Sequence, residues 1–395
     1  MTPGARVSAA IEILDEVFAG SPAERTLTRW ARGSRFAGSK DRAAVRDFVF
    51  DGLRRRRSLG HLGGSDSGRA VMMALLADQD PGSYFSGEGF APAPLSEDER
   101  ARLVGTRDTT DFATRFDIPD FLEQPLKDAL GARVEDVLKA QQSRAPVDLR
   151  VNTLRASVGT AEEALAEDDI VSERLPQAQG ALRVTDNARR IQNSRAYLSG
   201  MVELQDLSSQ IVALKAEARP GMTVLDYCAG GGGKTLALGA QMEGRGRLLA
   251  HDINPGRMKD IPHRAARAGL RVDTIDTRAL PSLAGACDLV LVDAPCSGSG
   301  AWRRNPDSKW KLTLETLERL TQIQADILRR ASAFVRPGGR MVYATCSLLE
   351  MENTHQIDEF LAAQPKWERR SQVLLTPVDA GDGFFFADLA QAKST

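Results

Sequence analysis

The sequence of 395 residues has few cysteines and no long apolar run. Its four cysteines, Cys228, Cys287, Cys296 and Cys346, are too few and too widely spaced for a disulfide scaffold or a zinc site. No apolar stretch reaches the roughly 18–20 residues that a transmembrane helix needs. The first residues also lack the charged and then apolar layout of a secretory signal. We therefore expect a cytoplasmic protein that has no metal site and does not enter a membrane.

An excess of either charge is also missing. The sequence has 52 Lys and Arg residues against 53 Asp and Glu residues, for a net charge of −1. The whole chain is therefore not a polycation, although a local basic face is still possible. Basic residues do cluster at Arg54–Arg57 and at Arg303–Arg304. Taken alone, such runs fit a solvated helix face as well as a nucleic-acid contact.

Hydrophobic periodicity and composition divide the chain into three parts. They predict an all-helical domain over 1–140, a small α+β subdomain over 146–200 and an α/β domain over 201–390. Within the first part, residues 1–57 and 97–140 have helical spacing, and the Gly- and Ser-rich segment 58–68 is expected to be a loop. No internal repeat or low-complexity tail interrupts this layout.

The α/β part alternates strands and helices in the manner of a doubly wound, Rossmann-like sheet. Strands are predicted at 223–227, 246–252, 271–276, 287–294 and 339–346. In such sheets, ligands bind outside the carboxyl ends of the strands. Those ends carry four acids and one thiol, namely Asp226, Asp252, Asp276, Asp293 and Cys346. This edge of the sheet is therefore the candidate ligand site.

The turn after the first of these strands holds four consecutive glycines. It reads Cys228-Ala229-Gly230-Gly231-Gly232-Gly233-Lys234-Thr235. A Walker A loop fails because its first glycine would be Cys228, and a nicotinamide fingerprint fails because its third glycine would be Thr235 or Leu236. An S-adenosylmethionine site is left, with Asp252 placed to accept hydrogen bonds from ribose hydroxyls. A flexible loop without a ligand is the alternative.

Two of the cysteines follow predicted strands and are flanked by small polar residues. Cys296 lies in Asp293-Ala294-Pro295-Cys296-Ser297-Gly298, and Cys346 lies in Thr345-Cys346-Ser347. A thiolate that adds to carbon 6 of a pyrimidine makes carbon 5 able to attack the methyl group of a sulfonium. Asp293 is well placed to hydrogen-bond the nitrogen edge of the ring, and cytosine matches that acceptor better than uracil. A small buried hydrophobe is the alternative for each cysteine.

The motifs together resemble those of the RsmB/Nop (Sun-type) RNA cytosine-5 methyltransferases. The resemblance covers about residues 148–390, and residues 1–140 more loosely resemble the NusB-like helical domain of bacterial RsmB proteins. Besides the turn and the two cysteine motifs, it rests on Gln205-Asp206, Ser208-Ser209-Gln210, Arg303-Arg304-Asn305-Pro306-Asp307, Lys309-Trp310, Glu352-Asn353 and Asp382-Gly383-Phe384-Phe385. The sequence departs from the family at Gly230 and Gly231, where Ala or Ser and then Pro are usual. It also keeps only the second half of the usual Pro-Glu-Glu-Asn, in Glu350-Met351-Glu352-Asn353.

The resemblance implies roles for individual residues. Cys346 would be the nucleophile, and Cys296 would help to release the covalent enzyme–RNA adduct. Cofactor and base would be held by Asp252, Asp276, Asp293 and the turn from Cys228 to Lys234. Arg150, Asn152, Arg303 and Arg304 would contact RNA.

The function that the resemblance implies is S-adenosylmethionine-dependent formation of 5-methylcytosine in 16S ribosomal RNA, and we expect a monomer. Three alternatives stay open. They are a transfer-RNA cytosine-5 methyltransferase, a non-enzymatic RNA-binding ribosome assembly factor with a vestigial cofactor fold, and an NTPase built on Gly233-Lys234-Thr235. Cys228 disfavours the NTPase, because it stands where the Walker A pattern needs its first glycine.

Overall fold

The computed structural model describes residues 1–104 and 111–391. The part of the predicted helical region that covers residues 105–110 lies outside the described residues. The chain forms two compact units, one made of Met1–Arg144 with Trp302–Leu312 and the other of Ala145–Ala301 with Thr313–Thr395. Among the described residues, no helix combines the length and the apolar character needed to cross a bilayer.

The first unit contains only helices in its described part. They are α1 (Pro3–Phe18), α2 (Ala23–Gly33), α3 (Ser39–Arg54), α4 (Arg56–Gly63), α5 (Gly68–Leu75), α6 (Pro81–Tyr84), α7 (Glu97–Val104), α8 (Phe112–Arg115), α9 (Glu123–Leu130), α10 (Val134–Gln141) and α16 (Pro306–Lys311), with the 3₁₀ turns η1 (Asp120–Leu122) and η2 (Gly131–Arg133). One apolar core joins α1, α3 and α5 through side chains such as Leu14, Val49 and Met72. Burial of these apolar faces is the main force that holds the helices together.

The predicted loop at 58–68 is wrong over its first half, because α4 extends to Gly63. The glycines that suggested a loop serve helix packing and termination. A Cβ at Gly63 would lie 2.4 Å from the carbonyl oxygen of Ala70, so only glycine allows this approach of α5. Gly64, with φ of +82°, ends the helix in the left-handed conformation that glycine adopts without strain.

The segment Trp302–Leu312 belongs to the helical unit, although it lies far along the chain from it. The indole nitrogen of Trp310 donates to the carbonyl of Leu53 at 2.7 Å, and Lys309 donates to the carbonyl of Arg54 at 3.1 Å. Lys309 is buried, and burial lowers its pKa to about 8 against the raising effect of Asp117. The helical unit is therefore completed by a segment that lies between two stretches of the α/β unit in the sequence, which the sequence did not indicate.

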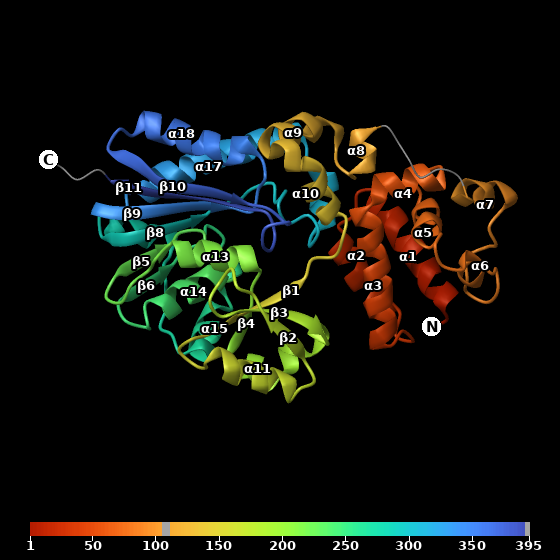
Figure 1. The fold of residues 1–395 in the computed structure, drawn as a ribbon, viewed down its shortest axis with the longest axis horizontal. Coiled ribbons are helices and arrows are strands. Elements are labelled where there is room, and N and C mark those ends of the chain that lie inside the picture. The colour runs from red at the N-terminus through yellow and green to blue at the C-terminus, as the bar shows by residue number, and fades with distance from the viewer. Residues whose placement is uncertain (105–110, 392–395) are drawn as a thin grey trace. The chain divides into compact units, whose positions relative to one another are not determined.

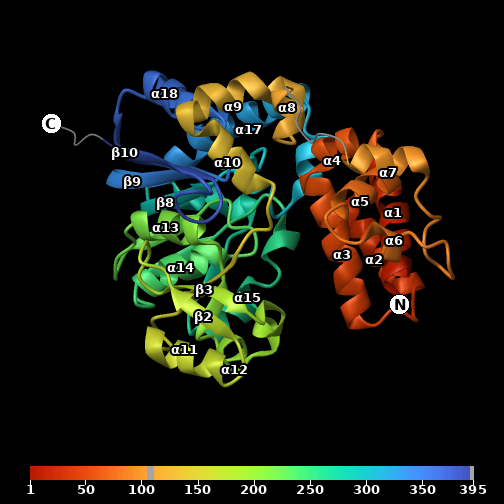
Figure 2. The ribbon, with the colours of Figure 1, turned by 45° about the vertical axis from the view of Figure 1, so that its right-hand side comes forward.

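The second unit begins with a four-stranded antiparallel sheet in the order β2-β3-β1-β4. Its strands are β1 (Val147–Val151), β2 (Val171–Arg174), β3 (Ala181–Asp186) and β4 (Val202–Leu204), and its helices are α11 (Val158–Ala166), η3 (Ala188–Asn193) and α12 (Arg195–Leu198). Leu149, Leu182 and Val202 point to one face, where they pack on Leu165 of α11 and Ala196 of α12. Figure 2 shows α11 and α12 beside β2 and β3.

A seven-stranded sheet in the order β10-β11-β9-β8-β5-β6-β7 forms the rest of this unit. The strands are β5 (Thr223–Asp226), β6 (Arg247–Ala250), β7 (Asp273–Thr274), β8 (Cys287–Asp293), β9 (Val335–Thr345), β10 (Trp367–Leu375) and β11 (Phe384–Gln391). All neighbours from β9 to β7 are parallel, whereas β11 is antiparallel to both β9 and β10. The predicted Rossmann-like fold is confirmed, and β7 is shorter than the predicted strand at 271–276.

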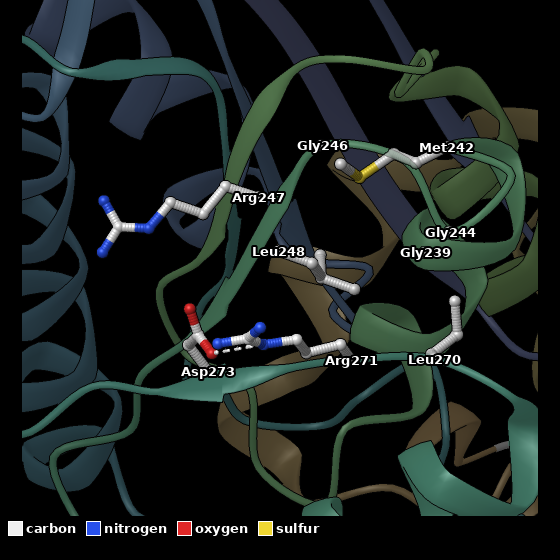
Figure 3. A pocket seen from close by; sticks show the side chains of 9 residues that line it. All are labelled: Gly239, Met242, Gly244, Gly246, Arg247, Leu248, Leu270, Arg271 and Asp273. Atoms are coloured by element: carbon white, nitrogen blue, oxygen red, sulfur yellow. Dashed lines mark ion pairs between the residues drawn. The ribbon is translucent and has the colours of Figure 1, made fainter.

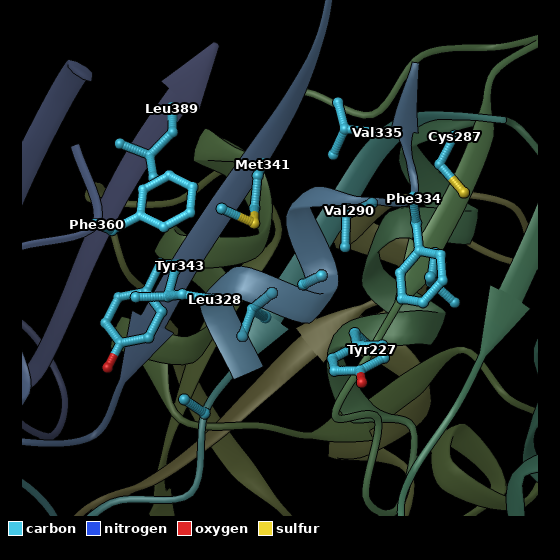
Figure 4. Packing of buried hydrophobic residues seen from close by; sticks show 14 of the residues in the cluster. Tyr227, Cys287, Val290, Leu328, Phe334, Val335, Met341, Tyr343, Phe360 and Leu389 are labelled. Atoms are coloured by element: carbon cyan, nitrogen blue, oxygen red, sulfur yellow. The ribbon is translucent and has the colours of Figure 1, made fainter. Parts of the chain in front are cut away.

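Helices cover both faces of this sheet (Figure 1). The helices and 3₁₀ turns of this part are α13 (Leu207–Lys215), α14 (Gly233–Gln241), η4 (Pro255–Met258), α15 (Ile261–Ala268), η5 (Thr277–Leu283), α17 (Leu314–Ser332), η6 (Glu350–Glu352) and α18 (Thr354–Ala363). Val290 and Met341 point towards Leu328 of α17 and Phe360 of α18, as Figure 4 shows. Leu289 and Val342 point to the opposite face, towards Leu238 of α14. This alternation buries the strands on both sides and leaves the strand ends as the open edge.

Candidate active site

A cavity of about 1100 Å³ lies at the carboxyl ends of the parallel strands. The predicted strand-end residues Asp226, Asp252, Asp293 and Cys346 all line it. Asp276 is exposed and instead caps η5 by accepting a hydrogen bond from the amide of Arg278 at 2.8 Å. Its neighbour Thr277 lines the cavity. Four of the five predicted strand ends therefore converge on one space.

The glycine turn forms one wall of the cavity through Gly230, Gly231 and Gly233. Gly230 and Gly232 have φ of +52° and +83°, a region that residues with a Cβ rarely adopt. A Cβ at Gly232 would also lie 2.8 Å from the side chain of Ile261 in α15. Two of the four glycines are thus required by backbone conformation, one of them also by close packing.

Asp252 ties the glycine turn to the end of β6. Its buried carboxylate accepts hydrogen bonds from the amides of Gly230 at 3.0 Å and Asn254 at 2.9 Å, and Arg257 approaches it at 3.1 Å. Each carboxylate oxygen can accept a second hydrogen bond. Asp252 can therefore shape the turn and still accept a hydrogen bond from a ligand.

Asp226 is almost fully buried beneath the turn. Its Oδ2 accepts a hydrogen bond from the hydroxyl of Thr235 at 2.6 Å, whereas Oδ1 has no hydrogen-bond partner. Burial raises the pKa of Asp226 to about 7, and the charge of nearby Asp293 adds to the effect. An unpartnered buried acceptor on the wall of a cavity marks a place where a ligand donor would be stabilised.

Lys234 is the residue after the glycines, and its side chain points towards Asp293 and Phe384. Its Nζ lies 2.8 Å from Oδ2 of Asp293 and 4.6 Å from the ring centroid of Phe384. Burial acts to lower the pKa of Lys234, but the Asp293 carboxylate outweighs it, and the pKa is raised. Lys234 is therefore a buried ammonium beside the thiols.

The sulfur atoms of Cys296 and Cys346 lie 3.4 Å apart, and both residues line the cavity. Both cysteines follow predicted strands, and the structure brings their thiols together. The loops that carry them are joined where the amide of Gly300 donates to the carbonyl of Cys346 at 2.9 Å. The hydrogen bond to Cys346, together with burial, raises the pKa of Cys296.

The other two cysteines differ from this pair. Cys287 begins β8 and is fully buried in the apolar core, where burial raises its pKa to about 11 (Figure 4). Cys228 lines the cavity in the glycine turn, and burial raises its pKa further, with the nearby carboxylate of Asp226 adding to the effect. Cys296 shares the raised pKa, so what distinguishes the pair is the contact between its two sulfur atoms.

Three of the residues predicted to contact RNA are buried. Arg150 donates to the side-chain oxygen of Gln205 at 2.7 Å, and Asn152 donates to the carbonyls of Gly200 at 3.1 Å and Ala268 at 2.9 Å. Arg303 is only 6% exposed. These three side chains are held inside the protein, so their burial does not support the prediction that they contact RNA. Arg304 is exposed.

Arg150 has a different relation to the site. Burial lowers its pKa to about 10, and its partner Gln205 lines the cavity. Arg150 therefore holds Gln205, a residue of the cavity wall, by a hydrogen bond from outside the cavity. Gln205, Phe384 and Glu352 lie within motifs that carried the family resemblance, yet no role was predicted for them. A sequence motif indicates that a residue has a role, but it does not show which neighbours its side chain contacts.

A second cavity, of about 300 Å³, lies at the amino ends of β6 and β7 (Figure 3). It is lined by Gly239, Met242, Gly244, Gly246, Arg247, Leu248, Leu270, Arg271 and Asp273. Its charged residues are Arg247, Arg271 and Asp273, with Arg271 and Asp273 paired at 3.5 Å. It contains none of the predicted site residues. Among the described residues, no group of three or more metal-ligating side chains could hold a metal ion.

Two segments of this chain match known protein families. Residues 212–390 match the family described as 16S rRNA methyltransferase RsmB/F, and residues 118–190 match the ferredoxin-like domain of RsmF/B-like methyltransferases. The ribosomal RNA small subunit methyltransferase B of Klebsiella pneumoniae is 30% identical over 319 residues, which cover 78% of this chain and 74% of that protein.

Solved structures have the same fold. The crystal structure of PH0851 gives a TM-score of 0.77 at 22% identity and covers 98% of this chain and 99% of that chain. NSun6 from Pyrococcus horikoshii with SFG gives 0.62 at 19% identity, covering 70% of this chain and 99% of that chain. With the fold, the cavity and the relative from Klebsiella in agreement, the chain belongs to the RsmB/F family of RNA methyltransferases.

Proposed function

We propose that this protein transfers a methyl group from S-adenosylmethionine to carbon 5 of a cytosine in small-subunit ribosomal RNA, through a covalent bond between Cys346 and carbon 6. The observation that carries the proposal is the pair of thiols 3.4 Å apart on the wall of the cavity that the glycine turn also lines. The name of the Klebsiella relative supports ribosomal RNA as the substrate. We further propose that the protein acts in the cytoplasm as a monomer.

The residues present fit S-adenosylmethionine. The cavity of about 1100 Å³ has room for it beside a base. Gly230, Gly231 and Gly233 leave the wall without side chains, so a ligand can approach the backbone closely. The unpartnered Oδ1 of Asp226 could accept from an ammonium group, and Asp252 could accept from ribose hydroxyls. When bound, the cofactor supplies an electrophilic methyl group.

Cys346 starts the reaction on the base in this proposal. Its thiolate forms a bond to carbon 6, and the electron pair displaced towards carbon 5 makes that carbon the nucleophile for the methyl group. A base then removes the proton from carbon 5, and the bond between sulfur and carbon 6 breaks. Cys296, with its sulfur 3.4 Å from that of Cys346, is placed to take part in this release.

Asp293 and Lys234 stabilise the base during attack. When the thiolate adds to carbon 6, the ring nitrogen takes up a proton from solvent, and this proton offsets the negative charge that the attack brings to the ring. The Asp293 carboxylate stabilises that protonated nitrogen and the neighbouring amino group by accepting a hydrogen bond from each. Lys234 holds this carboxylate at 2.8 Å and so keeps it oriented. Uracil would present a carbonyl oxygen to Asp293 instead of an amino group, so the acceptor favours cytosine.

The test is a single-turnover assay with radiolabelled S-adenosylmethionine and fragments of small-subunit ribosomal RNA. The wild-type protein should label one cytosine. Cys346→Ala should give no product, whereas Cys296→Ala should accumulate a protein–RNA complex that survives a denaturing gel. Normal turnover by Cys346→Ala would overturn the assigned mechanism, and exclusive labelling of transfer RNA would overturn the substrate.

A further inference from the structure

A fully buried carboxylate lies behind the two thiols. Glu352, the last residue of η6, has no exposed surface and accepts four hydrogen bonds. Its Oε1 accepts from the amide of Ser297 at 2.8 Å and from Nε2 of Gln324 at 3.0 Å. Its Oε2 accepts from the hydroxyls of Ser297 and Ser347, each at 2.5 Å. Four donors satisfy a charge that would otherwise be very costly to bury.

These donors place Glu352 between the two cysteine loops. Ser297 directly follows Cys296 and Ser347 directly follows Cys346, so one carboxylate holds the residue next to each thiol. Gln324 of α17 strengthens the first loop because its Nε2 also donates to the carbonyl of Pro295 at 2.9 Å. The two loops therefore share one anchor.

The second loop is held in further ways. The amide nitrogen of the Asn353 side chain donates to the carbonyl of Ser347 at 2.9 Å, and Thr345 donates to the side-chain oxygen of Asn353 at 2.5 Å. The hydroxyl of Tyr343 donates to the carbonyl of Glu352 at 2.7 Å. The residues on both sides of Cys346 are thus tied to the pair Glu352 and Asn353.

Glu352 is not among the residues that line the cavity, so a bound base or cofactor would not reach it. Its influence on the chemistry must pass through the loops that it joins. Because the thiols act in sequence on one base in the proposed function, their separation matters, and a displacement of about 1 Å can slow a reaction about 100-fold.

We propose that Glu352 is a positioning residue that holds Cys296 and Cys346 close enough to act on the same base. The thiol separation is a property of the protein alone. Only the assignment of reaction steps to each thiol rests on the proposed function.

The first experiment measures the separation without RNA or cofactor. Phenylarsine oxide bonds to two neighbouring thiols at once and releases its oxygen as water with the two thiol protons. The wild-type protein should bind one arsenical that a large excess of a monothiol removes slowly, and Cys296→Ser should abolish this binding. In Glu352→Gln, which keeps the shape but replaces an acceptor with a donor, monothiol should remove the arsenical about 100-fold faster.

Two controls accompany this measurement. Glu350→Gln changes an exposed glutamate in the same turn and should bind the arsenical as the wild type does. Cys228→Ser should also keep the binding. Wild-type retention of the arsenical by Glu352→Gln would overturn the proposal.

Two variants that each remove one hydroxyl donor to Glu352 keep the proposal testable even if Glu352→Gln does not fold. Ser347→Ala releases the Cys346 loop and should slow formation of the covalent complex, whereas Ser297→Ala releases the Cys296 loop and should make that complex accumulate. The KM for RNA should change less than kcat in both. A purely structural role predicts lower melting temperatures without a larger change in kcat than in KM, and that result would overturn the proposal.

Failure of this inference and failure of the proposed function are distinguishable. If the wild-type protein makes no 5-methylcytosine while Glu352→Gln loses stable arsenical binding, the positioning role stands and the proposed function falls. If 5-methylcytosine forms at the wild-type rate in Glu352→Gln, the positioning role falls and the proposed function stands.

Discussion

The ammonium nitrogen of Lys234 lies 2.8 Å from Oδ2 of Asp293, although 59 positions separate the two residues in the chain. Lys234 lies in the first turn of helix α14, which follows the glycine turn, and Asp293 ends strand β8. The pair therefore connects the proposed cofactor turn to the loop that carries Cys296. A buried cation at this point can hold the carboxylate that we expect to face the base.

Replacing this cation should disable methyl transfer. Lys234→Met keeps the length of the side chain but removes its charge, so Asp293 would lose its partner and its orientation. We expect the single-turnover rate to fall about 100-fold or more. Lys215→Met, at an exposed lysine on α13, is the matched control and should react at the wild-type rate. A wild-type rate in Lys234→Met would contradict the role of the pair.

Asp226 should make stability depend on pH. Its folded pKa of about 7 lies above its ordinary value of 3.8, so between these values the folded protein holds a proton that the unfolded chain has lost. The free energy of unfolding should therefore fall as the pH rises through this window, by at most about 1.4 kcal/mol per pH unit. Asp226→Asn cannot titrate and should lack this part of the slope. Urea unfolding at pH 5, 6 and 7 without cofactor measures the difference, and parallel profiles would rule the prediction out.

The glycines of the turn should differ in their tolerance of a side chain. Gly232→Ala places a Cβ on a residue with φ of +83° and against Ile261, at a cost of roughly 1–2 kcal/mol from the backbone alone. Gly231 has no positive φ, and its Cβ would meet only the guanidinium group of Arg264 at 3.3 Å. Gly231→Ala should therefore unfold close to the wild type in a urea titration. Equal losses of stability in the two variants would show that the conformation of the turn is not the cause.

The two kinds of residue predicted to contact RNA should separate experimentally. Arg304→Ala, at an exposed position, should weaken RNA binding and reduce the slope of log K against log salt by about 1. Asn152→Ala removes a buried donor to two carbonyls and should cost about 1–3 kcal/mol of stability while RNA affinity stays unchanged. Filter binding at several salt concentrations, paired with urea unfolding, tests both. An unchanged salt slope in Arg304→Ala would remove this arginine from the RNA interface.

Local patterns were sufficient to predict the five parallel strands β5 to β9 and the residues at their carboxyl ends, but they did not predict the antiparallel strands β10 and β11. Continuous apolar runs such as Leu289–Val292 indicate strands buried on both faces, and parallel strands bring their carboxyl ends to one edge. Asp226, Asp252, Asp293 and Cys346 were therefore predicted to meet without knowledge of the structure. Asp276 was grouped with them by the same rule, but β7 ends at Thr274 and its strand end turns into a cap for η5.

Composition was a weaker guide where a residue serves packing. The glycines at 60, 63 and 64 predicted a loop, whereas α4 uses Gly63 for close approach to α5. Arginines at 150 and 303 suggested RNA contact, yet both are buried. Residue type alone does not tell whether a polar side chain finds a partner inside the protein or faces solvent, since that depends on chain segments far away in sequence.

The sequence by itself determined the chemical groups available at the strand ends and the order in which the chain presents them, because side-chain identity and periodicity are local properties. The tertiary structure decided the distances between those groups. It set the 3.4 Å between the sulfur atoms, the burial that raises the pKa of Asp226, the four donors around Glu352, and the inclusion of Trp302–Leu312 in the helical unit. Each of these arises from contacts between distant segments, and such contacts form only when the whole chain has packed.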